Sequence, residues 1–265
     1  MDLKIKDKSF IVCGATSGFG HAIAKQIMDE GGNVIAVARG EAKLKEMQDA
    51  FHGQVEILVG DITESKTIRQ LYKLAENRSP DGIVVNASGP PAKKFMETSL
   101  MDWDEAYRQL VRWKIELTQI FLPLFLKKNS GRFVYIESAS VKQPLDNLVL
   151  STSMRLSVVG LVKTMSQELP DKGITFNVLA PGYHYTPAVE RLINKKAENQ
   201  KISKKEARFQ IENDIPMKKT GNINHFASLA VWLLSQFSEY LNGQVYAVDV
   251  GVIKSTLLYM RWINY

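Results

Sequence analysis

The chain has 265 residues, of which 45% are hydrophobic and 23% charged, ordinary values for one soluble globular domain with a well-filled core. A single cysteine, Cys13, excludes an intrachain disulfide and a cysteine-based metal site, and the histidines lack metal-ligand spacing, so we expect no metal. No apolar run is long enough to cross a bilayer, and the N-terminus lacks the apolar centre of a signal peptide. We therefore expect a cytoplasmic protein with no membrane partner.

The formal net charge of +6 raises the question of a nucleic-acid partner. Much of the excess lies in basic residues between 195 and 208, which are interleaved with Glu198 and Glu206. Such interleaving is typical of a solvated helix face rather than of a stripe that binds phosphates. We expect no nucleic-acid partner, and only a general attraction of anionic small molecules such as a nucleotide cofactor.

Apolar runs alternate with amphipathic stretches along the whole chain, and no linker divides it. In chain order, strands are expected at residues 9–13, 33–38, 55–59, 82–86, 131–137, 174–179 and 244–248. Helices are expected at 21–30, 43–51, 64–77, 102–127, 156–169, 188–213 and 225–235. This alternation predicts an α/β protein, a single-domain Rossmann fold whose doubly wound parallel sheet of about seven strands is flanked by helices. We expect one domain over 1–265, with a helical excursion at about 188–215 beside the substrate.

A glycine-rich segment, 14–20, follows the first expected strand and opens the first expected helix. Glycines in this place let the backbone approach a pyrophosphate, and the helix N-terminus offers free N–H groups to it. A tight turn alone also needs glycine, but three glycines in seven residues exceed what a turn requires. We expect cofactor contacts from Gly14, Thr16, Ser17, Gly18, Phe19 and Gly20.

The second expected strand ends in Ala38-Arg39, where an NAD-selective site usually has an acidic side chain for the ribose 2′-OH. A guanidinium at Arg39 can instead pair with a 2′-phosphate through charge-assisted hydrogen bonds. An ordinary exposed arginine is the alternative interpretation. The missing acid and the adjacent base both favour NADP(H) as the cofactor, with NAD(H) as a possible second ligand.

Further motifs resemble those of the short-chain dehydrogenase/reductase family over nearly the whole chain. The glycine segment has the family's G-x-x-x-G-x-G spacing, 86–89 is similar to its N-N-A-G motif, and Trp103-Asp104 to its W-D helix start. Residues 181–187 resemble the P-G-x-x-x-T-P segment beside the nicotinamide, and 243–249 resemble its last strand. The resemblance implies that the remaining cofactor contacts come from Asp61, Ile62, Asn86, Ala87, Ser88, Gly89, Arg155, Pro181, Gly182 and Thr186. It also implies a homo-oligomer, either a dimer or a tetramer.

The resemblance fails at the catalytic positions, which in this family hold Ser, Tyr and Lys assisted by Asn. Ser138 fits the serine position, but the tyrosine and lysine positions hold Ser151 and Arg155, and the assisting position holds Leu110. A serine hydroxyl is a far weaker acid than a phenol of pKa about 10, and an arginine of pKa above about 12 cannot shuttle a proton. Arg155 can still bind ribose hydroxyls or phosphate, so cofactor binding is better supported than the family's usual mechanism.

Another group would then have to supply the proton. His184 has the most suitable intrinsic pKa, and Tyr183, Tyr185 and Lys142 are other candidates. Two functions stay open: an NADP(H)-dependent oxidoreductase with an atypical proton donor, acting on a small-molecule carbonyl or alcohol, or a catalytically inactive NADP(H)-binding sensor or partner subunit. We favour the oxidoreductase, with catalytic candidates Ser138, Ser151, Arg155 and His184.

The substrate pocket is expected between the loop 89–91, residues 143–148 and the helical excursion. Pro90, Pro91, Leu145 and Leu148 are apolar, which indicates an at least partly apolar ligand, although a small sugar also stays open. The tail 257–265 is unusually apolar for a free terminus, which predicts a homotetramer with this tail packed at a subunit interface or over a neighbour's pocket. Packing of the tail on its own subunit is the alternative interpretation.

Overall fold

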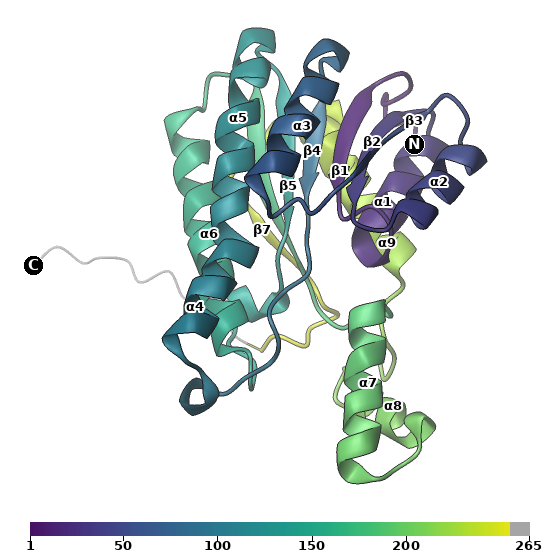
Figure 1. Cartoon of the computed structure of the whole chain (residues 1–265), viewed down its shortest axis with the longest axis vertical. Helices are drawn as coiled ribbons and strands as arrows, with labels where there is room; N and C mark the ends of the chain where they lie inside the picture. Colours follow the sequence, from purple (N-terminus) through teal and green to yellow (C-terminus); the bar gives the residue numbers. More distant parts are fainter. Residues whose placement is uncertain (255–265) are drawn as a thin grey trace, which may run out of the picture.

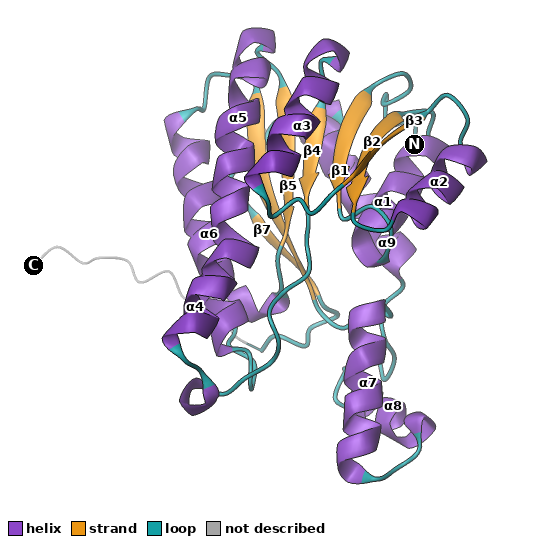
Figure 2. Ribbon diagram, viewed as in Figure 1, coloured by secondary structure: helices purple, strands orange, loops and turns teal. Residues whose placement is uncertain are grey.

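The computed structural model describes residues 1–254, and these form a parallel sheet covered by helices on both faces (Figures 1 and 2). The strands are β1 (Ser9–Cys13), β2 (Asn33–Ala38), β3 (Val55–Val59), β4 (Gly82–Val85), β5 (Gly131–Ile136), β6 (Ile174–Pro181) and β7 (Val245–Val248). They are ordered β3-β2-β1-β4-β5-β6-β7, and every neighbouring pair is parallel. The predicted fold class, a doubly wound Rossmann sheet of seven strands, is confirmed for the described residues.

The helices are α1 (Gly18–Asp29), α2 (Glu41–Ala50), α3 (Ser65–Ala75), α4 (Leu100–Tyr107), α5 (Trp113–Lys128), α6 (Val149–Glu168), α7 (Pro187–Gln200), α8 (Lys204–Asn213) and α9 (Ile223–Leu234). Alternate residues of each strand face opposite helical layers, because side chains alternate along a strand. In β1, Phe10 and Val12 join the core under α1, α2 and α9, whereas Ile11 and Cys13 join the core under α3, α5 and α6. Both faces are thus apolar, as a sheet covered on both sides requires.

Two of the helices that cover the sheet differ from the predictions. The single helix expected at 102–127 is divided by a π-helical turn, η3 (Arg108–Arg112), between α4 and α5. Helix α6 begins at Val149 rather than at 156, so Ser151 and Arg155 both lie within it. Its first turns were not predicted because their buried face carries polar side chains, which interrupt the apolar stripe used to recognise a helix.

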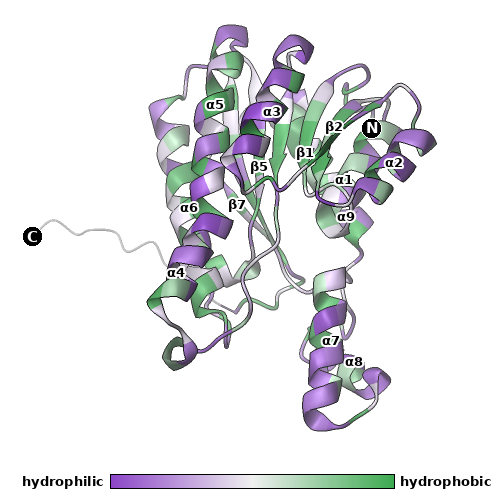
Figure 3. Cartoon of the chain, viewed as in Figure 1, coloured by the Kyte–Doolittle hydropathy of each residue, from purple (hydrophilic) through white to green (hydrophobic). Residues whose placement is uncertain are grey.

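The excursion after β6 forms a helical hairpin, α7 and α8, that projects from the carboxyl end of the sheet (Figure 1). Lys201, which adopts a left-handed conformation with φ of 52°, ends α7 and so divides the stretch predicted as one helix. The hairpin has a small apolar core of its own, while its outer surface is largely hydrophilic (Figure 3). Among residues 1–254, no helix has the length and apolar character needed to cross a membrane.

Candidate functional site

The glycine loop between β1 and α1 lies at the carboxyl edge of the sheet, next to β4, where doubly wound folds bind nucleotides. Gly14 and Gly18 have φ of +67° and +55°, the left-handed region that favours glycine. Ser17 is the N-cap of α1, and within the described chain its side chain does not cap the helix. The first N–H groups of α1 are therefore available to a phosphate.

Gly20 is the most tightly enclosed residue of the loop. A Cβ added at Gly20 would lie 2.3 Å from the Gly14 carbonyl oxygen and 3.0 Å from Asn86 Nδ2. The Asn86 amide in turn donates to the Cys13 carbonyl at 3.3 Å, which ties the end of β1 to the loop after β4. This loop is thus a cradle that requires glycine, and its shape fits the pyrophosphate of a dinucleotide.

The ends of β2 and β3 bring Arg39 beside Asp61. Arg39 Nη1 lies 3.5 Å from Asp61 Oδ2, and the Arg39 side chain is 73% exposed. Asp61 is itself held by Thr63, whose backbone N–H and hydroxyl both donate to Oδ1. Ile62, between them, is buried. Arg39 is consequently an exposed cation that can turn to a ligand phosphate, since its present partner is a weak, solvent-screened one.

Other predicted cofactor residues converge on the same edge. Thr186, the N-cap of α7, has its methyl group 3.7 Å from the Cβ position of Gly18. At Gly89, an added Cβ would lie 3.1 Å from Arg155 Nη2. The structure therefore places the loop after β6 against the glycine loop, and Arg155 against the 86–89 loop. Gly182, which follows β6, packs closely on Asp249 at the end of β7.

Ser138 and Ser151 present their hydroxyls in a similar way. The Ser138 oxygen accepts a hydrogen bond from the Ser140 backbone N–H at 3.1 Å, and the Ser151 oxygen accepts one from Arg155 Nε at 3.1 Å. Each hydroxyl hydrogen thus stays available for donation to a ligand. Ser138 caps η4 (Ala139–Val141), which packs against α6, the helix that carries Ser151 and Arg155.

A buried cluster of charges adjoins Arg155. The Glu137 carboxylate accepts from Lys114 Nζ at 2.5 Å and from Arg155 Nη1 at 2.8 Å. Nη1 also donates to the Ile136 carbonyl at 3.3 Å. Burial lowers the pKa of Lys114 to about 8, and the charge of Arg155 lowers it as well, whereas Glu137 raises it. Lys114 and Glu137 were not predicted as site residues. A glutamate directly after the apolar run 133–136 was the available signal for Glu137, whereas Lys114, which stands between Arg112 and Glu116, had no such signal.

His184 does not have the predicted position of a proton donor. Its ring packs against Phe19 and Phe226 at centroid distances of 5.3 and 5.4 Å, and its Nδ1–H donates to the Gly182 carbonyl at 3.2 Å. Burial lowers the pKa of His184 below its ordinary value, an effect that this hydrogen bond partly opposes. The ring is thus a packing element beneath the glycine loop. Phe19 shares this role, which leaves only its backbone for contact with a cofactor.

The two neighbouring tyrosines take part in other contacts. Burial raises the pKa of Tyr183, and the charges of Asp214 and Asp146 raise it further. Tyr183 packs on the α7–α8 core, while the exposed Tyr185 ring lies 5.0 Å from the Arg208 guanidinium. Neither position favours proton transfer near neutral pH.

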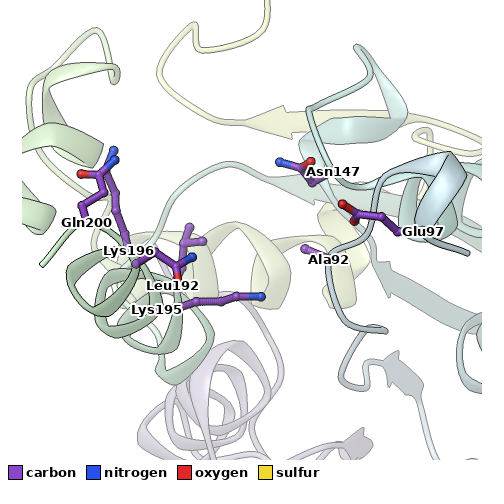
Figure 4. Close-up of a pocket in the computed structure, with 8 residues that line it drawn as sticks. Ala92, Glu97, Asn147, Leu192, Lys195, Lys196 and Gln200 are labelled. Atoms are coloured by element: carbon purple, nitrogen blue, oxygen red, sulfur yellow. The ribbon is translucent and has the colours of Figure 1, made fainter.

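A cleft of about 460 Å³ opens between α7 and the loops after β4 and β5 (Figure 4). Its lining comprises Ala92, Glu97, Asn147, Leu192, Lys195, Lys196, Asn199 and Gln200. Residues of 143–148 and of the helical excursion line this cleft as predicted, whereas the loop 89–91 does not, and Pro90, Pro91, Leu145 and Leu148 are not among the lining residues. Exposed turns of α7 contribute polar side chains, but the larger part of the lining surface is apolar, which agrees with the predicted partly apolar pocket.

Comparison with known proteins places this geometry in a family. The sequence model described as Enoyl-(Acyl carrier protein) reductase matches residues 14–253. The chain belongs to the short-chain dehydrogenase/reductase family. Among this family's curated members, the NADPH-dependent reductase BacG of Bacillus subtilis is 26% identical over 255 residues, which cover 94% of this chain and 98% of BacG. The 3-oxoacyl-(acyl-carrier-protein) reductase FabG of Aquifex aeolicus is 25% identical over 260 residues, covering 95% of this chain and 100% of FabG.

Solved structures of other reductases share the fold. L-sorbose reductase from Gluconobacter frateurii, complexed with NADPH and L-sorbose, gives a TM-score of 0.91 at 23% identity, covering 97% of this chain and 100% of that chain. The prediction of an oxidoreductase of this family is therefore confirmed, and the names of the relatives agree with the predicted NADP(H) preference. The inactive alternative finds no support among them.

Proposed function

We propose that this short-chain dehydrogenase/reductase transfers a hydride between NADP(H) and a small carbonyl or alcohol substrate, with Ser151 and Arg155 at the positions that usually hold Tyr and Lys. The observation that carries the proposal is the position of the Arg155 guanidinium. It lies between Gly89 of the cofactor loop and the Ser151 hydroxyl, so one side chain can contact both a cofactor and the group beside the substrate.

The residues at the carboxyl edge of the sheet fit NADP(H). The glycine loop and the start of α1 would hold the pyrophosphate, and Arg39 would pair with the 2′-phosphate. Arg155 and the 86–89 loop would contact the nicotinamide ribose, and the segment 181–186 would flank the nicotinamide. NAD(H) would bind more weakly, because it lacks the phosphate that Arg39 recognises.

The cofactor supplies the hydride, and the protein supplies the environment in which the substrate oxygen becomes negative. Ser138 and Ser151 donate their hydroxyl hydrogens to that oxygen, and the Arg155 charge polarises Ser151. Ser151 stabilises charge without acting as the acid, because its hydroxyl has no base to activate it. We propose that a solvent water supplies the proton, since His184 is directed elsewhere.

We infer the class of substrate from the residues that line the cleft. Lys195 and Lys196 line one wall, and neither forms an ion pair with a carboxylate of the described residues, while Glu97 and Asn147 lie opposite (Figure 4). The polar ends of these side chains over a partly apolar wall favour a small carbonyl compound, and the two lysines favour one with an anionic group. Binding of such a ligand needs no nucleic-acid or membrane partner.

We further propose a cytoplasmic homo-oligomer, either a dimer or a tetramer. Phe95 and Met96, in the turn before α4, and Leu100 and Met101, in its first turn, are exposed, and large apolar side chains exposed within one short segment favour a protein contact. The apolar tail, 257–265, which we also predict at an interface, lies outside the described residues.

Two measurements test the function. NADPH binding is titrated by fluorescence, and NADPH oxidation is followed against a panel of aldehydes, ketones and quinones, with carboxylate-bearing and neutral members in matched pairs. We expect tight NADPH binding and turnover of at least one carbonyl compound, fastest for an anionic one. NADPH binding without turnover of any panel member would overturn the catalytic proposal, and a lack of NADPH binding would overturn the cofactor as well.

A further inference from the structure

Three charged side chains meet beneath the candidate site in a region closed to solvent. The side chains of Glu137, Lys114 and Arg155 are 0%, 1% and 9% exposed. Each oxygen of the Glu137 carboxylate has its own cation, Lys114 Nζ at 2.5 Å on one and Arg155 Nη1 at 2.8 Å on the other. Two cations and one anion leave this cluster with a single net positive charge.

Such a cluster is a costly way to stabilise a fold, because each charge must be taken out of water and apolar side chains of similar size often serve as well. Its geometry points to a role at the site above it. We propose that Glu137 and Lys114 are positioning residues: Glu137 fixes the Arg155 guanidinium toward Ser151 and Gly89, and Lys114 offsets the Glu137 charge so that Arg155 stays effectively cationic. This inference rests on the proposed function.

The three sides of the guanidinium show how Glu137 fixes it. Nη1 is held by Glu137 and by the Ile136 carbonyl, Nε donates to Ser151, and Nη2 is directed to Gly89. Because the guanidinium is planar, fixing Nη1 also sets the directions of the other two nitrogens. Without the Glu137 oxygen, Arg155 would keep its charge but lose the contact that orients it.

The proposed effect of Lys114 on Arg155 and Ser151 comes from its charge, since its side chain contacts Glu137 rather than either of them. A lone Glu137 carboxylate would cancel most of the positive potential that Arg155 creates at Ser151, because interactions at these distances are strong in a dry interior. Lys114, on the far side of the carboxylate, restores that potential. Helix α5 places Lys114 there directly after the π-helical turn η3, a feature that is frequent at functional sites.

The titratable groups around Lys114 are Glu137 and Tyr135 from the β5 side and Arg155 from α6. The pKa of Lys114 is lowered to about 8, chiefly by burial. Below that pH the cluster carries one net positive charge, and above it none. Stabilisation of a negative substrate oxygen should therefore weaken as the pH rises through about 8, and the turnover number should fall with it.

Positioning is tested with two double variants that have the same charge. In Lys114→Met/Glu137→Gln the amide oxygen can still accept from Arg155, whereas in Lys114→Met/Glu137→Ala nothing replaces it. We expect NADPH to bind the Gln variant with a Kd within about 3-fold of the unmodified protein and the Ala variant about 10-fold more weakly, as expected when a ligand-binding side chain loses its support. Equal NADPH affinity in both variants would overturn the positioning role, even if the unmodified protein binds NADPH as proposed.

Charge compensation is tested with Lys114→Met alone, using the carbonyl compound that the unmodified protein reduces fastest. We expect kcat at pH 7 to fall about 10- to 100-fold, less than for loss of an oxyanion donor itself, and the double variant with Gln to recover most of it. The fall of kcat above pH 8 should disappear in Lys114→Met and persist in Lys127→Met, a control at an exposed position of the same helix. If Lys114→Met does not fold, a flat kcat between pH 7 and 9 in the unmodified protein would still overturn this role.

Discussion

Gly20 is the position where the cofactor loop has the least room, and Gly20→Ala tests this loop directly. The new Cβ would lie 2.3 Å from the Gly14 oxygen, so the two must separate by roughly 0.7 Å to reach even the closest ordinary contact. Gly14 cannot easily withdraw, because its N–H donates to the Val37 carbonyl at 2.9 Å. We expect overpacking to lower the free energy of unfolding by about 1–3 kcal/mol.

The same displacement moves the N–H groups that would hold the pyrophosphate. We therefore expect Gly20→Ala to weaken NADPH binding by more than about 10-fold, equivalent to at least about 1.4 kcal/mol. Urea unfolding measures the stability and NADPH fluorescence the affinity. Gly160→Ala is the matched control: an added Cβ there meets nothing within 4 Å in the middle of α6, and the alanine should add about 0.5–1 kcal/mol of stability. Wild-type stability and NADPH affinity in Gly20→Ala would refute the close approach.

Four further predictions have separate outcomes. Arg39→Ala should narrow the affinity gap between NADPH and NADH by about 1–3 kcal/mol, and equal affinities in the unmodified protein would contradict that role. Ser138→Ala should raise the activation free energy by about 2.7–4 kcal/mol, as for an oxyanion donor, and Ser151→Ala by about 1.5–3 kcal/mol, so an unchanged kcat in both would exclude the two-hydroxyl site. Burial lowers the pKa of His184, so the unfolded chain takes up a proton before the folded chain does as the pH falls below about 6.5. The free energy of unfolding should therefore drop by at most about 1.4 kcal/mol per pH unit. Thermal melts of His184→Phe should show a smaller dependence of stability on pH. Light scattering should give a dimer or tetramer, and truncation after Ser255 tests the predicted interface; a monomer mass for the full chain would rule out the assembly.

The sheet and the cofactor loop could be predicted because their signals are local. Each strand is a short apolar run, and the predicted strands agree with the structure to within two residues at each end. The glycine loop is recognisable in the sequence from the spacing of its glycines, and the structure brings Gly14 and Gly20 of this loop close together. The start of α6 could not be found in this way, since Ser151 and Arg155 are buried polar residues that only tertiary contacts make acceptable inside a core.

The contacts within the site were less accessible to prediction, because they depend on which way side chains turn. His184 has a suitable intrinsic pKa, but its direction is set by packing against Phe19 and Phe226 from two different helices. Glu137 and Lys114 are 23 residues apart in the sequence, and neither position indicates the other. Only the packing of α5 against the end of β5 brings them together beside Arg155.

The contacts around Arg155 depend on one another, and they are the basis of our proposal that a site with serine and arginine at these positions serves hydride transfer. A serine occupies less space than a tyrosine, and the Arg155 Nε lies 3.1 Å from the Ser151 oxygen in the space that results. A buried guanidinium needs an anion nearby. Glu137, the residue directly before Ser138, provides it, with a carboxylate oxygen 2.8 Å from Arg155 Nη1. A buried glutamate beside one cation would cancel its charge, and Lys114 offsets that loss. In the proposed arrangement a fixed positive charge takes the place of the family's proton donor, so the protein would stabilise the substrate oxyanion and leave its protonation to solvent.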